Sequence, residues 1–126
     1  MRAIDTNLLV RLIVRDDPAQ VRKAEMFVAP GAWVSHLVLA ETLWVLDAVF
    51  RLTPERIARA VEMLLNHSSL TLQDADVVAE ALASFLKHRR LGFSDCLLVE
   101  IARKAGHLPV GTFDRGLAKL KGTQAV

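Results

Sequence analysis

Cysteine is almost absent from the sequence, because Cys96 is the only one among 126 residues. A single cysteine excludes an internal disulfide and any cysteine-rich zinc site. The four histidines include no pair spaced four residues apart, so the sequence does not favour a zinc hydrolase. No apolar run approaches the ~18 residues that a membrane-spanning helix needs, and no signal-peptide pattern precedes Asp5. We therefore expect a soluble cytoplasmic protein without membrane contact.

The composition that remains is typical of an ordered globular chain. Hydrophobic residues make up 52% of the sequence and charged residues 24%, and low-complexity segments are absent. A chain of this length predicts one domain spanning residues 1–126. The net charge of +2 is only weak support for an anionic partner.

The positive charges are dispersed except for one basic run, Lys87-His88-Arg89-Arg90. Two interpretations of this run remain open. Cationic side chains at the end of a helix complement the helix dipole, and cationic side chains also contact the phosphates of RNA. Both roles are compatible with the sequence.

Short apolar segments alternate with longer helical patterns along the whole chain. Strands are expected near residues 3–5, 32–34, 70–72 and 108–112, and no hairpin turn joins any two of them. This alternation predicts parallel strands joined by right-handed helical crossovers. We expect an α/β fold, a three-layer α/β/α sandwich around a short parallel sheet of four or five strands. Ligands of such sheets bind beyond the carboxyl ends of the strands, where we expect Asp5 and Asp114.

Helix boundaries are also marked locally. Asp17 before Pro18, Ser35 before an apolar helix of residues 36–50, and Thr53 before Pro54 are typical N-cap patterns. Gly106 follows an expected helix of residues 95–105 in the position of a left-handed C-terminal residue. Asp114 is expected to begin a final short helix of residues 115–120.

Four acidic residues are candidates for a shared site: Asp5, Glu41, Asp95 and Asp114. Asp95 and Asp114 taken alone also fit simple roles at helix starts. Glu41 is different, because its neighbours one turn away, including Leu37 and Trp44, are apolar. Burial of an ionised carboxylate without a partner costs several kcal/mol. No lysine or arginine lies one turn from Glu41, so we expect a cation there, and oxygen ligands favour Mg²⁺ or Mn²⁺.

The order of these motifs resembles that of the PIN-domain nucleases. Asp5-Thr6-Asn7 follows the first strand, Glu41 lies in an apolar helix, FSDCLL at 93–98 begins a helix, and TFD at 112–114 follows a strand. The short chain is similar to the VapC-type toxins of toxin–antitoxin pairs. The resemblance implies a metal-dependent endoribonuclease. It implies Asp5 and Asp95 as the principal metal ligands, Glu41 and Asp114 as completing the acidic pocket, and Thr112 as a supporting hydrogen-bonding residue.

The resemblance also implies partners: an RNA substrate, a cognate antitoxin and a second copy of the chain, with residues 8–15 and 37–50 as the contact surfaces. Two alternatives remain. A PIN-like module that binds RNA or protein without cutting is disfavoured, because all four acids are intact. A receiver-type phosphoacceptor domain requires an aspartate at the end of a mid-chain strand, and the sequence has none there.

Overall fold

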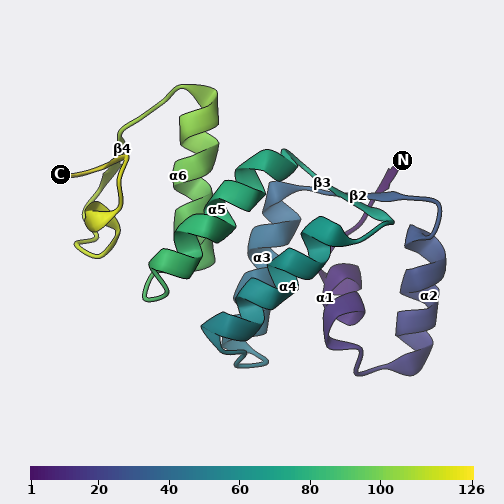
Figure 1. Ribbon diagram of the computed structural model, residues 1–126. Helices are drawn as coiled ribbons and strands as arrows, with labels where there is room; N and C mark the ends of the chain where they lie inside the picture. Colours follow the sequence, from purple (N-terminus) through teal and green to yellow (C-terminus); the bar gives the residue numbers. More distant parts are fainter. The chain divides into compact units, whose positions relative to one another are not determined.

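The computed structural model describes residues 1–126, which form two compact units, Met1–Ala75 and Asp76–Val126. The N-terminal unit holds three short strands and four helices (Figure 1). In chain order these are β1 (Arg2–Ala3), α1 (Thr6–Val14), α2 (Pro18–Val28), β2 (Ala32–Val34), α3 (His36–Ala48), α4 (Pro54–Asn66) and β3 (Leu70–Leu72).

The three strands of the N-terminal unit form one parallel sheet in which β2 lies between β1 and β3. Ala32 pairs with Arg2 on one side and with Leu70 on the other. Two helices separate each strand from the next along the chain. The predicted alternation of strands and helices is therefore confirmed in this unit.

The helices of this unit begin where the sequence predicts. Asp17 accepts a hydrogen bond from the backbone N–H of Gln20 (3.1 Å), and Pro18 occupies the first turn of α2. Ser35 caps α3 by accepting from Val38 N (3.1 Å), and Thr53 caps α4 in the same way. Each cap satisfies a backbone donor that the helix itself leaves unpaired.

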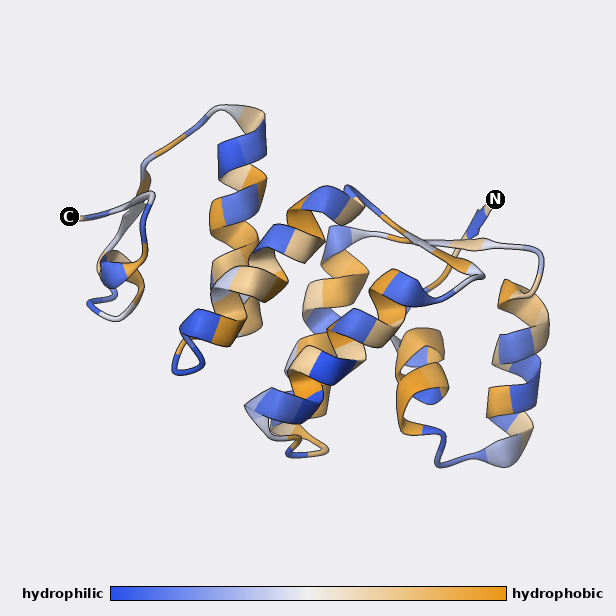
Figure 2. Ribbon diagram, in the orientation of Figure 1, coloured by the Kyte–Doolittle hydropathy of each residue, from blue (hydrophilic) through white to orange (hydrophobic).

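The hydrophobic core of the N-terminal unit is built around α1, which packs against both α2 and α3. Leu9 of α1 and Leu39 and Leu46 of α3 are almost completely buried. Figure 2 shows α1 and α3 as mainly hydrophobic, whereas α2 and α4 carry many hydrophilic residues. The packing of α1 on α3 fixes the position of the loop between β1 and α1, from which Asp5 projects.

The C-terminal unit comprises two α-helices of 13 residues each, a 3-10 helix and a two-stranded parallel sheet. Its elements are α5 (Ala75–Lys87), α6 (Phe93–Ala105), β4 (Val110–Thr112), the 3-10 helix η1 (Leu117–Lys119) and β5 (Thr123–Ala125). Phe85 of α5 and Phe93 of α6 pack edge to face, with ring centroids 5.7 Å apart. Gly106 ends α6 with φ +83°, as predicted for a left-handed C-terminal residue.

The α/β fold with short parallel strands is thus confirmed, although several details differ from the expectation. The five strands are divided between two sheets, three strands in one unit and two in the other. The final helix is shorter than residues 115–120, because only Leu117–Lys119 form a 3-10 turn. None of the helices is long and apolar enough to cross a membrane.

Candidate metal-binding site

In the N-terminal unit, Glu41 of α3 is hydrogen-bonded to the residue that follows Asp5. Asp5 caps α1, and its Oδ1 accepts a hydrogen bond from Leu8 N (3.0 Å). The next residue, Thr6, donates from its hydroxyl to Glu41 Oε2 (2.8 Å). Thr6, which directly follows Asp5, therefore contacts Glu41 although Glu41 lies 35 residues further along the chain.

Glu41 differs from the sequence-based expectation in its surroundings. Its neighbours Leu37 and Trp44 are 68% and 67% exposed, and Glu41 itself is exposed. The expectation that Glu41 is buried was therefore wrong. The α3 face that carries Glu41 is apolar but open to solvent, and the hydrogen bond from Thr6 is the contact that orients the carboxylate.

The C-terminal unit brings the second pair of acids, Asp95 and Asp114, near each other. Asp95 lies in the first turn of α6, which begins at Phe93 rather than at Asp95. Asp114 follows β4, and its Oδ1 accepts hydrogen bonds from the backbone N–H groups of Gly116 (2.7 Å) and Leu117 (3.1 Å). Thr112 Oγ1 accepts a hydrogen bond from Asp114 N (2.9 Å), so Thr112 supports the turn that presents Asp114.

The carboxylate of Asp114 affects Asp95 electrostatically. The pKa of Asp95 is raised, first because the side chain is partly buried and second because the Asp114 carboxylate repels its charge. A hydrogen bond from the backbone of Gly92 offsets part of this effect. A bound cation would reduce this repulsion between the two negative charges.

The donor set fits a hard divalent cation. Asp5, Glu41 and Asp114 each hydrogen-bond through one carboxylate oxygen, and their second oxygens form no hydrogen bond. Oxygen donors of this kind are the ligands of Mg²⁺ and Mn²⁺. Neither unit by itself gathers three or more acidic, histidine or cysteine side chains. Each unit holds two of the four candidate acids, Asp5 and Glu41 in one and Asp95 and Asp114 in the other.

Thr6 is the site residue that the sequence reasoning missed. Its hydroxyl links the Asp5 loop to Glu41, and only the structure identifies this partner. The signal in the sequence was slight: a hydroxyl residue directly after a candidate metal ligand. Asn7, the third residue of the same motif, forms no hydrogen bond through its side chain and lines a groove between α1 and α2.

Comparison with known proteins gives one match. The model of the PIN domain family matches residues 3–122, which include all four acids and both units. No curated protein and no solved structure matches the chain. Members of this family are in general metal-dependent nucleases, and the match covers nearly the whole chain. The chain belongs to the PIN domain family.

Proposed function

We propose that this PIN domain protein is an endoribonuclease that depends on Mg²⁺ or Mn²⁺. The observation that carries the proposal is the placement of the acids. Thr6, the residue after Asp5, hydrogen-bonds Glu41 in one unit. In the other unit, partial burial and the Asp114 carboxylate raise the pKa of Asp95. We propose further that residues 1–126 act as one nuclease domain and that the four carboxylates are its metal ligands.

The proposed roles of the residues follow from the resemblance to the PIN-domain nucleases. Asp5 and Asp95 would be the principal metal ligands, and Glu41 and Asp114 would complete the acidic pocket. Thr112 holds the turn at Asp114 through the hydrogen bond to its backbone N–H. The bound cation would supply an activated water and offset negative charge on the scissile phosphate. The protein's own contribution is to hold the carboxylates and the RNA in position.

Cleavage of a labelled RNA by the purified protein tests this proposal. We expect cleavage with Mg²⁺ or Mn²⁺ and none in EDTA. Asp95→Asn should lower the rate by more than about 100-fold, since even residues that only support metal ligands are typically worth 10–100-fold. Calorimetry with Mn²⁺ should show weaker metal binding by the same variant.

Asp47→Asn provides a matched control, because Asp47 is an exposed acid on α3 that takes no part in either pair. This variant should cleave at the wild-type rate. Cleavage that persists in EDTA would contradict the metal dependence. Metal binding without any cleavage would favour the alternative of a PIN-like module that binds RNA or protein.

We also propose that the protein is the cytoplasmic toxin of a toxin–antitoxin pair, that it forms a homodimer and that it binds a cognate antitoxin. Support comes from apolar side chains that α3 and its end expose, namely Leu37, Trp44 and Val49. Exposed apolar patches of this kind mark interaction surfaces. Light scattering should show a dimer, and the protein should co-purify with the small product of an adjacent gene. Monomers at high concentration would contradict the dimer.

A further inference from the structure

A pocket of about 470 Å³ in the C-terminal unit has basic side chains at its edge and no acidic side chain in its lining. It is formed where the turn after α5 meets η1. Arg90 and Lys119 supply positive charge, and Leu91 and Leu120 supply apolar surface. Pockets of this size accommodate small ligands or single building blocks of a polymer.

The helix dipole does not account for these charges. Helix α5 ends at Lys87, so within the basic run only Lys87 lies in the last helical turn. The stabilising interaction between a cation and the helix dipole falls off within that turn. Arg90 lies three residues beyond the helix, in a turn closed by the hydrogen bond from Leu91 N to His88 O (2.9 Å). Neither Arg90 nor Lys119 forms an ion pair.

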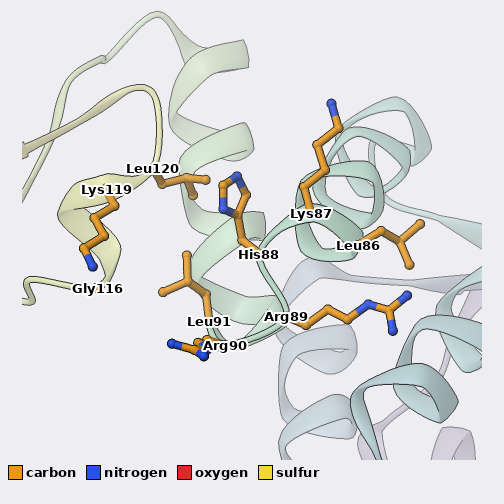
Figure 3. Close-up of a pocket in the computed structure, with 9 residues that line it drawn as sticks. All are labelled: Leu86, Lys87, His88, Arg89, Arg90, Leu91, Gly116, Lys119 and Leu120. Carbon is orange, nitrogen blue, oxygen red and sulfur yellow. The ribbon is translucent and has the colours of Figure 1, made fainter.

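The arrangement of side chains in the pocket suits a nucleotide. Figure 3 shows the imidazole of His88 turned toward Leu120, with Leu91 below it and Lys119 across the space on η1. A planar ring beside aliphatic side chains offers a surface for a base, and RNA-binding proteins use histidine among their stacking residues. The neighbouring guanidinium and ammonium groups offer contacts for phosphates.

The pocket also adjoins one of the candidate metal ligands. Gly116 lines the pocket, and its backbone N–H donates to Asp114 Oδ1 (2.7 Å). A Cβ atom at position 116 would lie 3.2 Å from this oxygen and 3.6 Å from Leu91 Cδ2. Because Gly116 has no side chain, Asp114 lies directly beside the pocket.

We infer that this basic pocket binds one nucleotide of single-stranded RNA next to the scissile position, with its phosphates on Arg90 and Lys119 and its base against His88. The inference rests on the proposed nuclease function and adds to it a place where the substrate is held. Binding in the pocket needs no metal, because the contacts come from cationic and apolar side chains alone.

The experiment measures the anisotropy of a fluorescein-labelled oligouridine of twelve nucleotides in EDTA, so that binding is separated from cleavage. For single strands each phosphate contact scales the association constant with roughly the −0.7 power of the salt concentration. Arg90→Ala/Lys119→Ala should therefore lower the salt slope by about 1.4 and weaken binding by up to about 25-fold at 0.1 M salt. His88→Ala should weaken binding about fivefold without changing the slope.

Arg22→Ala/Arg59→Ala is the matched control, because it removes two charges from exposed positions on α2 and α4. Its salt slope should equal that of the wild type. The inference is overturned if the pocket variant behaves like this control, or if the wild type binds no oligouridine. It is also overturned if the pocket variant loses affinity for a labelled oligoglutamate but not for RNA, since the pocket then binds an acidic protein. Asp95→Asn should bind RNA normally, so loss of its cleavage tests the nuclease proposal separately.

Discussion

Asp5 allows the capping role of one carboxylate to be separated from its proposed metal-binding role. One of its oxygens caps α1 through Leu8 N, and the other forms no hydrogen bond. Asparagine is about as effective an N-cap as aspartate, whereas alanine has no acceptor. Asp5→Asn should therefore keep the helix cap and lose the charge that attracts a cation, and Asp5→Ala should lose both.

The expected magnitudes differ clearly between the two variants. Loss of an N-cap costs about 1 kcal/mol, which corresponds to a fall in Tm of about 3–6 °C for a chain of this size. In EDTA, Asp5→Ala should therefore melt several degrees below the wild type and Asp5→Asn close to it. A ligand present at 100 times its Kd stabilises a protein by about 2.7 kcal/mol. Saturating Mn²⁺ should therefore raise the Tm of the wild type. It should raise the Tm of Asp5→Asn and of Asp5→Ala much less.

Thermal melts with and without Mn²⁺ and an RNA cleavage assay complete the comparison. Both variants should lose cleavage, although only Asp5→Ala loses stability in EDTA. Asp5→Ser offers a further check, because serine caps helices without a charge. If Asp5→Asn melted as low as Asp5→Ala, the role of the cap would be wrong. If Asp5→Asn kept both the Mn²⁺ shift and the cleavage, the role of Asp5 as a metal ligand would be wrong.

The candidate acids, Thr6 and the buried thiol each give a further prediction. In metal-free protein, Asp114→Asn should lower the raised pKa of Asp95 in an NMR titration, and an unchanged pKa would contradict the repulsion. The pKa of Asp95 in the folded protein lies above its usual value of 3.8. The ionised side chain therefore lowers the stability of the fold at pH values above the folded pKa, and this loss disappears as the pH falls. Asp95→Asn should accordingly raise the Tm in EDTA at pH 7. Thr6→Val should reduce cleavage about 10–100-fold through misplacement of Glu41, and Thr6→Ser should restore it. Burial raises the pKa of Cys96, so thiol reagents should label Cys96 only under denaturing conditions.

Local signals in the sequence predicted the helix boundaries well. Ser35 and Thr53 act as caps, and Gly106 is left-handed, because these features depend on a few neighbouring residues. The division of the strands into two sheets was not predictable in this way. Strand pairing depends on contacts between distant segments, and strands of two or three residues such as β1 and β4 carry little pattern to specify them.

The sequence named candidate residues for the site, and these stay a prediction, but it did not indicate their local contacts. The order of the four acids resembled the PIN domain pattern, and the family match includes all of them. The burial inferred for Glu41 was wrong, because an apolar sequence neighbourhood does not determine whether a helix face is covered. The bond from Thr6 to Glu41 joins two helices and has no local signature. Pairwise contacts between distant residues are therefore the part that needs a structure.

The structure also changes how acids at helix starts are to be interpreted. From the sequence, a capping role and a metal-binding role are alternatives for Asp114, because either explains an aspartate at that place. In the structure Asp114 Oδ1 holds the turn that leads to η1, and its second oxygen forms no hydrogen bond. A carboxylate fixed by backbone donors loses less rotamer freedom when it binds a ligand. Capping is therefore compatible with the proposed role of Asp114 as a metal ligand, and the same reasoning applies to Asp5 at the start of α1.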